Sequence, residues 1–354
     1  MFSFFMKLIA LCVLCILLIS CSERVELSVH SDIEIVADNL NVPWEIDFLP
    51  DGDMIVTERA GNLIRIGEDR KVIPIDGVID RGEGGLLGFA LHPDFEQNQW
   101  IYLYFTSDST GEKENRVERY YLNLKDNKIE QKKIIISGIP SALFHDGGRI
   151  RFGPDGYLYI TTGDATVEEL SQDTTSLAGK ILRVDDGGDA VSDSPFGNEV
   201  YSYGHRNSQG IAWDVQGNLW ATEHGRSGLL SGFDELNRIE KGKNYGWPIV
   251  QGDETQQDMM LPVIHSGADD TWAPSALVVL DERIFFVGLR GEALYEYNTE
   301  TKVLKEQFKN QFGRLRTIAY RDDFLYIGTS NRDGRGSPYE TDDRILKVRV
   351  DGLK

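Results

Sequence analysis

Residues 153–164 read Gly-Pro-Asp-Gly-Tyr-Leu-Tyr-Ile-Thr-Thr-Gly-Asp, a polar turn sequence followed by a run of aromatic and β-branched residues. Pro-Asp-Gly is typical of a tight turn, and a short run of this composition after it is typical of a β-strand. Residues 179–184 then read Gly-Lys-Ile-Leu-Arg-Val, a second short run in which apolar and charged side chains alternate in part. The stretch therefore predicts a turn followed by two strands.

This turn-and-strand unit recurs along the chain with a diverged sequence. Copies lie at 50–66, 98–120, 154–184, 216–222, 281–297 and 322–348. Their spacing, roughly 40 to 65 residues, is that of propeller blades, and short strands at even spacing favour a propeller over a sandwich. The alternative of two unrelated β-domains lacks support, because no Pro/Ser-rich linker interrupts residues 33–350. We therefore expect an all-β fold, a six-bladed β-propeller with four-stranded antiparallel blades.

The start of the chain has the form of a bacterial export signal. Lys7 precedes an apolar run at 8–19, which is shorter than the roughly 20 residues of a membrane-spanning helix. Residues 18–21, Leu-Ile-Ser-Cys, resemble a lipobox; a simple buried apolar start is the alternative. We expect a lipoprotein signal peptide at 1–20, a lipidated Cys21 with its tether at 21–31, and one propeller domain at 32–354. The protein would then be lipid-anchored in the cell envelope, on the extracytoplasmic side.

Cysteine usage and net charge narrow the class of protein further. Cys12, Cys15 and Cys21 are the only cysteines in the sequence, so the body after Cys21 must fold without an internal disulfide. The formal net charge of −20 argues against nucleic acid as a partner and against adhesion to anionic lipid. Solubility alone would also explain this charge.

Five groups of residues place glycine or charge where the surrounding pattern is apolar. They lie at 82–93, at 144–149, at 204–210, at 223–225 with 234–235 and 244–248, and at 313–316. Binding and catalytic groups are commonly placed on loops that a rigid scaffold holds. His145 is the candidate base, because an ordinary histidine titrates near neutral pH. A lone loop histidine is, however, more often structural than catalytic, so from this residue alone both interpretations stay open.

Three of these stretches resemble the soluble quinoprotein glucose dehydrogenases and the related aldose sugar dehydrogenases. They are Gly-Leu-Leu-Gly-Phe-Ala-Leu-His-Pro-Asp-Phe at 85–95, Tyr-Gly-His-Arg-Asn-Ser-Gln-Gly at 203–210, and Lys-Asn-Tyr-Gly-Trp-Pro at 243–248. The resemblance runs from about residue 41 to the C-terminus. It implies a six-bladed propeller that uses pyrroloquinoline quinone and calcium, which agrees with the six units counted above.

The resemblance also implies roles for individual residues. His145 would be the general base that removes the proton of the sugar's anomeric hydroxyl. The residues that would contact the quinone or the substrate are Glu83, Arg206, Asn207, Arg290, Arg314 and Arg316. The planar fork of arginine suits a cofactor with three carboxylates. For any single arginine, an exposed ion pair of little energetic consequence is the alternative.

Calcium would have two sites on this resemblance. Backbone carbonyls of Gly225 and Arg226 would face the calcium at the quinone, where a divalent cation acts as a Lewis acid. Glu235 and the carbonyl of Tyr245 would hold a second, structural calcium.

Two residues depart from the family pattern. Arg226 stands where relatives have proline, and residues 227–233 form a longer loop than theirs. Glu83 replaces a glutamine and adds negative charge. We expect four further histidines to be structural: His92, His205, His224 and His265.

The leading hypothesis is oxidation of aldose sugars at the anomeric carbon to lactones, with an external electron acceptor and a monomeric or weakly dimeric protein. One alternative is a calcium-dependent propeller lactonase, which needs carboxylates converging on the channel that the loop sequences do not supply. The other is a non-enzymatic ligand-binding propeller.

The lipobox generates a test of location. Cys21→Ser should release the protein from the membrane fraction of expressing cells, because the thiol that carries the lipid is gone. Fractionation followed by immunoblotting measures this, and membrane retention equal to that of the wild type would contradict the lipid anchor.

Overall fold

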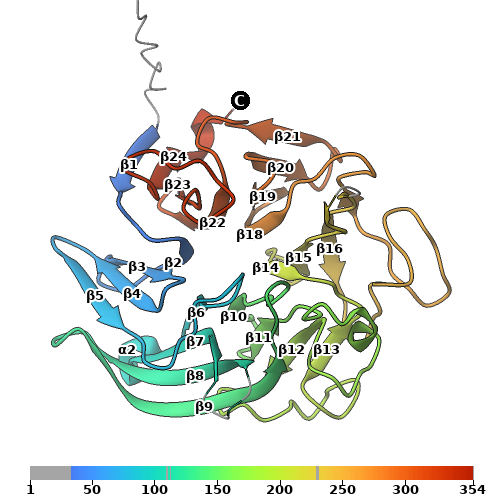
Figure 1. The fold of residues 1–354 in the computed structure, drawn as a ribbon, viewed down its shortest axis with the longest axis horizontal. Coiled ribbons are helices and arrows are strands. Elements are labelled where there is room, and N and C mark those ends of the chain that lie inside the picture. The colour runs from blue at the N-terminus through green and yellow to red at the C-terminus, as the bar shows by residue number, and fades with distance from the viewer. Residues whose placement is uncertain (1–32, 109–110, 112, 229–230, 354) are drawn as a thin grey trace, which may run out of the picture. The chain divides into compact units, whose positions relative to one another are not determined.

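Six four-stranded antiparallel sheets stand around a common axis as the blades of a propeller (Figure 1). They belong to residues 34–354 of the computed structural model, which describes residues 33–108, 111, 113–228 and 231–353. The sheets confirm the all-β, six-bladed prediction. Helical segments in the described residues are short, namely α2 (Phe95–Asn98) and the 3-10 turns η1 (Glu168–Ser171) and η3 (Val350–Gly352).

The first three blades follow one another in chain order, each beginning with its innermost strand. Their strands are β2 (Pro43–Phe48), β3 (Met54–Glu58), β4 (Asn62–Ile66) and β5 (Arg70–Pro74) in blade 1; β6 (Leu86–Leu91), β7 (Trp100–Ser107), β8 (Glu114–Asn123) and β9 (Lys128–Pro140) in blade 2; and β10 (Ile150–Phe152), β11 (Leu158–Thr161), β12 (Lys180–Val184) and β13 (Val200–Tyr203) in blade 3.

The remaining three blades complete the ring. Their strands are β14 (Ser208–Trp213), β15 (Leu219–Glu223), β16 (Glu235–Ile239) and β17 (Ile264–His265) in blade 4; β18 (Pro274–Leu280), β19 (Arg283–Gly288), β20 (Leu294–Asn298) and β21 (Leu304–Gln307) in blade 5; and β22 (Leu315–Arg321), β23 (Phe324–Thr329), β24 (Ile345–Arg349) and the N-terminal β1 (Ile33–Ala37) in blade 6.

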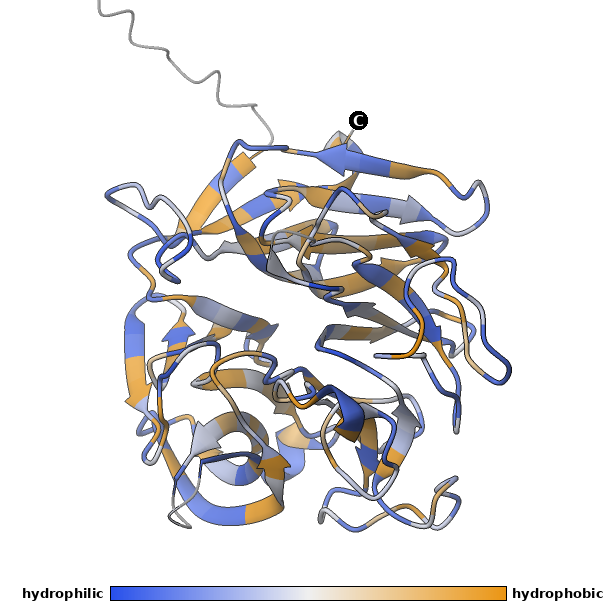
Figure 2. Ribbon diagram, turned by 45° about the vertical axis from the view of Figure 1, so that its right-hand side comes forward, coloured by the Kyte–Doolittle hydropathy of each residue, from blue (hydrophilic) through white to orange (hydrophobic). Residues whose placement is uncertain are grey.

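The six sequence units are the middle strands of the blades. Residues 154–184, for example, form β11 and β12, which pair with Tyr159 opposite Arg183 and Ile160 opposite Leu182. Apolar residues are concentrated on the strands of the blades, as Figure 2 shows. Neighbouring blades pack through these faces: Ile150 and Leu158 of blade 3 belong to the same buried cluster as Tyr104 of blade 2. Each large aliphatic side chain buried in this way contributes about 1.5–3 kcal/mol.

The two ends of the chain close the ring. β1 lies beside β24, so blade 6 takes three strands from the C-terminal end and one from the N-terminal end. The backbones of Leu40 and Asp343 exchange two hydrogen bonds, both of 3.0 Å. The carboxylate of Asp343 also accepts the Val42 N–H at 3.2 Å. Blade 6 is therefore joined by backbone pairing to the segment that leads into blade 1.

Bulges near the start of the inner strands direct side chains toward the axis. The register between the first two strands skips Trp44 in blade 1, Gln209 in blade 4 and Arg316 in blade 6. Bulges characteristically re-aim a side chain in this way. Arg316 Nη1 donates to Gln209 Oε1 at 3.1 Å, which joins blades 4 and 6 across the centre.

Arg149 occupies the centre of the ring together with these residues. Its guanidinium forms an ion pair with Glu45 of β2, and its Nε donates to the Gln209 carbonyl at 2.9 Å. The same group lies 4.1 Å above the centre of the Trp44 ring. Both charged side chains are almost fully buried, 1% exposed for Arg149 and 2% for Glu45. A buried charge without a partner is very costly, so these contacts hold blades 1, 3 and 4 in one arrangement.

The predicted signal peptide, Cys21 and the whole of the tether lie outside the described residues. In the described part of the chain, no helix is long and apolar enough to cross a membrane.

The central ion pair generates a stability prediction. Arg149→Met should lower the free energy of unfolding by about 3–5 kcal/mol, because it leaves Glu45 buried with only part of its compensation. Denaturant titration followed by tryptophan fluorescence measures the change. Lys347→Met is the matched control: Lys347 pairs at 3.3 Å with Glu34, whose side chain is 65% exposed. Its removal should cost about 0–1 kcal/mol. Equal losses in the two variants would contradict the prediction.

Candidate active site

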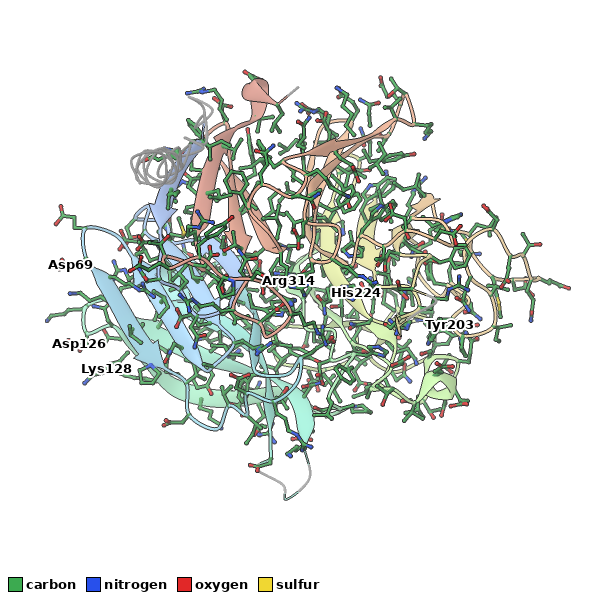
Figure 3. All side chains as sticks on the ribbon, turned by 45° about the horizontal axis from the view of Figure 1, so that its top comes forward. Asp69, Asp126, Lys128, Tyr203, His224 and Arg314 are labelled. Carbon is green, nitrogen blue, oxygen red and sulfur yellow. The ribbon has the colours of Figure 1, made fainter. Side chains whose placement is uncertain are left out.

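A cavity of about 420 Å³ opens at one end of the propeller axis. Its lining comes from two kinds of loop, those that lead from one blade to the next and those between the second and third strands of a blade. In an up-and-down sheet these two kinds of loop lie on the same face, so loops of every blade converge there. His224 and Arg314 of the lining lie near the middle of the molecule in Figure 3, and Asp69 and Asp126 at its edge.

The cavity brings together seven of the residues selected from the sequence. They are Glu83, His145, Arg206, Gly225, Arg226, Arg290 and Arg314. The other four selected residues do not line it: Asn207, Arg316, Glu235 and Tyr245. His224 was expected to be structural, but it lies in the cavity wall. The loops selected from the sequence therefore converge on one cavity, while four of the selected residues lie outside its lining.

His145 stands where the loop after β9 touches the loop after β11. Its backbone φ is +64°, and Gly147 follows with φ +63°. A Cβ on Gly147 would lie 2.6 Å from the Thr162 Cα, and one on Gly163 would lie 1.9 Å from the His145 carbonyl oxygen. Only glycine permits this approach of the two loops. The approach sets the imidazole beside the end of β11.

Asp164 orients the imidazole of His145. Its Oδ1 lies 2.7 Å from Nδ1 of His145 and accepts the Thr166 N–H at 2.7 Å. Its Oδ2 accepts the indole N–H of Trp247 at 2.9 Å. Asp164 is fully buried, whereas the His145 side chain is 15% exposed toward the cavity. Because a carboxylate only accepts hydrogen bonds, Nδ1 carries the hydrogen and Nε2 is the basic nitrogen.

Glu83 holds the His145 loop from the opposite side. Its Oε2 accepts the His145 N–H at 2.9 Å, and its Oε1 accepts Nη1 of Arg335 at 2.9 Å. Burial opposes ionisation, but the positive charges of His224 and Arg335 and the His145 N–H lower the pKa of Glu83 to about 2. Burial also lowers the pKa of His224 to about 4. His224 therefore carries its positive charge only at the low pH at which Glu83 itself titrates. At neutral pH His224 is uncharged, and Arg335 is the cation facing Glu83.

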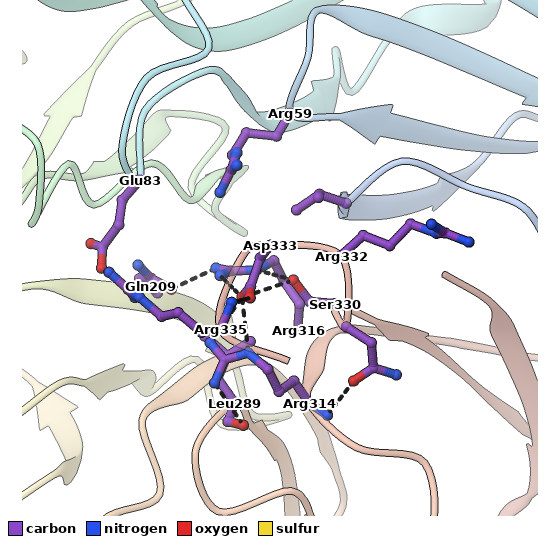
Figure 4. A network of polar contacts seen from close by, with 12 residues as sticks. Arg59, Glu83, Gln209, Leu289, Arg314, Arg316, Ser330, Arg332, Asp333 and Arg335 are labelled. Carbon is purple, nitrogen blue, oxygen red and sulfur yellow. Dashed lines mark hydrogen bonds and ion pairs between the residues drawn. The ribbon is translucent and has the colours of Figure 1, made fainter. Parts of the chain in front are cut away.

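Two arginines of β22 and the loop before it form a network under the cavity (Figure 4). Arg314 donates to Asp333 Oδ2 through Nε and Nη2, at 2.9 and 2.8 Å, and to the Leu289 carbonyl at 3.2 Å. Arg316 lies deeper, 3.8 Å from the same Asp333 oxygen, and burial lowers its pKa to about 9. Arg314 therefore faces the cavity, and Arg316 supports the wall from behind.

Polar atoms around Arg206 lack hydrogen-bond partners. Arg206 Nη2 donates to Ser227 Oγ at 2.8 Å, but Nε of Arg206, Nδ2 of Asn207 and Nε2 of His224 are buried without a partner in the part of the chain that the structure describes. Unpartnered buried donors are uncommon in folded proteins because each costs the free energy of its lost hydration. A ligand with acceptor groups would satisfy them.

The cavity has an excess of positive charge. It is lined by five arginines, Arg206, Arg226, Arg290, Arg314 and Arg335, and by two carboxylates, Glu83 and Asp234. Arg226 donates to the Ala268 carbonyl at 3.2 Å, and the exposed Arg290 donates to Ser231 Oγ at 2.9 Å. A carbonyl and a hydroxyl carry no net charge, so these hydrogen bonds leave the positive charge of Arg226 and Arg290 uncompensated. In a protein with a net charge of −20, such a cavity selects anions.

The expected metal ligands fall into two places. Gly225 and Arg226 line the cavity, and the Gly225 N–H is held by Asp234 Oδ1 at 2.8 Å. Glu235 is half-buried on β16 directly opposite Glu223 of β15, and desolvation together with Glu223 raises the pKa of Glu235 to about 8. Within the described residues, no group of three or more His, Cys, Asp or Glu side chains could hold a metal ion. A cation here would rely on backbone carbonyls.

Three residues that complete the site were not selected from the sequence: Asp164, Trp247 and Arg335. Asp164 directly follows the predicted strand, and Trp247 belongs to one of the stretches that carried the family resemblance. Their partners are 19, 83 and 252 residues distant in sequence, respectively. A polar residue just after a predicted strand was the one usable signal, and it applied to Asp164.

Known proteins resemble this chain along most of its length. The family model described as glucose / sorbosone dehydrogenase matches residues 40–337. The aldose sugar dehydrogenase YliI of Escherichia coli is 36% identical over 234 residues, which are 62% of this chain and 62% of that protein. Quinoprotein glucose dehydrogenase B of Acinetobacter calcoaceticus is 33% identical over 261 residues, 64% of this chain and 54% of that protein. The chain thus spans less than two thirds of the length of these curated relatives.

Solved structures extend the likeness to the whole propeller. The PQQ-bound form of the aldose sugar dehydrogenase of Streptomyces coelicolor has a TM-score of 0.83 at 38% identity, covering 90% of this chain and 97% of that one. The family model covers well over half of the chain, and the structural match covers nearly all of the propeller. The chain belongs to the glucose/sorbosone dehydrogenase family.

Proposed function

We propose that this protein oxidises aldose sugars at the anomeric carbon to lactones, with pyrroloquinoline quinone as its cofactor and His145 as the base. The observation that carries the proposal is the His145–Asp164 pair, joined at 2.7 Å in the wall of an arginine-lined cavity. Membership of the glucose/sorbosone dehydrogenase family supports it. So does the likeness to a relative whose structure is a PQQ-bound form.

The residues present fit this cofactor. The five arginines and two carboxylates of the cavity lining, together with the Asp333 carboxylate bound to Arg314, leave positive charge for a cofactor with three carboxylates. Arg206 and Arg314 present guanidinium groups suited to carboxylates. The buried Nδ2 of Asn207 and Nε of Arg206 would find acceptors on the quinone. When bound, the quinone supplies the acceptor for the two electrons and the hydrogen that leave the sugar as hydride.

The chain's own residues supply the acid–base part of the reaction. Nε2 of His145 takes the proton of the anomeric hydroxyl as the C1–H bond breaks. Asp164 stabilises the resulting imidazolium through its hydrogen bond to Nδ1. Glu83 accepts the backbone N–H of His145 and so fixes the backbone that carries the imidazole. The sugar loses one hydride from C1 and one proton from oxygen, and the product is the lactone.

Calcium binding is part of the same proposal. Carbonyls of Gly225 and Arg226 would face a cation at the cofactor; the Arg226 carbonyl also accepts the Gly232 N–H at 3.2 Å. Glu235, with the Tyr245 carbonyl, would hold a second calcium. The Glu223–Glu235 pair supports this second site, because two adjacent carboxylates repel each other without a cation between them.

Location and partners remain proposals that rest on the sequence. We infer a lipid-anchored protein of the cell envelope on the extracytoplasmic side, a monomer or weak homodimer. It would pass electrons from the reduced cofactor to an external acceptor.

The deciding experiment compares wild type and His145→Gln. Purified apoprotein is given quinone and calcium, and dye-linked oxidation of aldoses is measured. The wild type should reduce the dye with sugar. The variant should bind quinone with unchanged affinity. Its kcat should be lower by about 10²–10⁴-fold, the usual contribution of a positioned acid–base group. A wild type that binds quinone but oxidises no aldose would favour a binding protein. A variant with wild-type turnover would require another base.

A second prediction concerns Arg314, one of the arginines proposed to bind the carboxylates of the quinone. Arg314→Ala should weaken quinone binding by about 1.5–3 kcal/mol, the range for hydrogen bonds to charged groups. Arg332→Ala is the matched control, because Arg332 bonds the backbone carbonyls of Asp342 and Glu340 and does not line the cavity. Titration of the apoprotein with quinone measures both affinities. Equal affinities for Arg314→Ala and Arg332→Ala would remove Arg314 from the site.

A further inference from the structure

Trp247 lies between Asp164, which holds the proposed base His145, and Arg206, the arginine proposed to bind the cofactor. Its indole Nε1 donates to Asp164 Oδ2 at 2.9 Å, and the guanidinium carbon of Arg206 lies 5.2 Å from the centre of its ring. The residue is 9% exposed. One side chain thus contacts the carboxylate that orients His145 and the cation that would meet a carboxylate of the quinone. No role in the reaction described above has so far been given to it.

The backbone on both sides of this ring is fixed. The Trp247 N–H donates to the Gly204 carbonyl at 2.9 Å. The Trp247 carbonyl accepts Nε2 of Gln172 at 2.6 Å, and Gln172 Oε1 accepts the Asn244 amide at 2.7 Å. Gln172 directly follows the turn η1, which lies in the loop that begins at Asp164. The ring is therefore held against Asp164 from the backbone and has little freedom to retreat.

The hydrogen bonds of Asp164 show what the indole contributes. Oδ1 accepts two donors, Nδ1 of His145 and the Thr166 N–H. For Oδ2, Trp247 supplies the sole hydrogen bond that the described residues provide. A fully buried carboxylate with one oxygen unsatisfied is destabilised and free to rotate about its terminal torsion. Rotation would draw Oδ1 away from Nδ1 and release the imidazole.

We propose that Trp247 is a positioning residue. Its hydrogen bond fixes the Asp164 carboxylate, and Asp164 in turn holds the His145 imidazole at a set position relative to the Arg206 guanidinium. The two contacts use different parts of the indole. The indole N–H acts on His145 through Asp164, and the aromatic face contacts the guanidinium of Arg206. Substitutions can therefore separate them. The catalytic part of this inference rests on the proposed function, while the coupling of Trp247 to His145 does not.

The first test removes the N–H and keeps an aromatic face. Trp247→Phe should lower kcat by about 10–100-fold, the loss seen when hydrogen-bond partners behind the ligands of metal sites are removed, because the indole stands behind His145 in the same way. KM and quinone affinity should stay at the wild-type values, because the aromatic face under Arg206 remains. The primary isotope effect with C1-deuterated sugar should be at least as large as in the wild type, because the chemical step is the one that is slowed.

A readout on the apoprotein is independent of activity. The His145 Nδ1 hydrogen, bonded to a carboxylate at 2.7 Å, should give a low-field proton NMR resonance, assigned by its loss in His145→Gln. Trp247→Phe should shift or broaden this resonance. Trp220→Phe is the matched control, because it removes the same kind of bond, Trp220 Nε1 to Asp214 Oδ2 at 3.0 Å, in blade 4 away from the cavity. It should leave the resonance, kcat and quinone affinity unchanged.

Two further variants keep the inference falsifiable if Trp247→Phe folds poorly. Trp247→His retains a ring N–H at the same position of a five-membered ring, so its kcat should lie above that of Trp247→Phe. Trp247→Leu removes both contacts, so quinone affinity should fall along with kcat. An unmoved His145 resonance together with wild-type kcat in Trp247→Phe or Trp247→Leu would overturn the inference. If no protein oxidises sugar but the resonance responds as described, the proposed function fails and the coupling stands.

Discussion

Closure of the ring is the constraint on which the rest of the structure depends. A propeller blade alone leaves apolar faces uncovered, and each face is buried only by the next blade, so the series must return to its start. Here β1 joins β24 in blade 6, and the paired backbones of Leu40 and Asp343 complete the circle. Closure brings loops that are far apart in sequence to one end of the axis. The cavity is the direct consequence of that convergence.

Closure also sets a problem at the centre, where polar groups are buried. Arg149 and Glu45 are compensated by each other, and Gln209 accepts hydrogen bonds both from Arg149 and from Arg316. Bulges at the start of inner strands supply the geometry, because a skipped residue turns its side chain to the axis. Arg316 therefore belongs first to the centre of the fold and only indirectly to the cavity. Its neighbour Arg314, two residues earlier, faces the cavity instead.

The site combines a histidine held by a buried carboxylate with a surround of arginines. Asp164 is buried and bonded on both oxygens, which keeps the His145 imidazole in one tautomer and one orientation. Glu83 does not leave free negative charge in the cavity, because Arg335 donates to it at 2.9 Å. The carboxylate on the loop between blades 1 and 2 is thus matched by an arginine on a loop of blade 6. The positive charge that remains lies on arginines with neutral partners, such as Arg226 and Arg290.

The sequence by itself determined the number of blades and the position of the site's loops. The middle strands of each blade are apolar and follow polar turns, so units such as 154–184 were visible without coordinates. Inner and outer strands were not, because β10 has only three residues and outer strands such as β5 are largely exposed and lack an alternating pattern. Only the tertiary structure decided which side chains meet. Asp164 and Arg335 find partners across 19 and 252 residues, and such pairings follow from loop geometry and one-residue bulges, which leave no periodic pattern in the sequence.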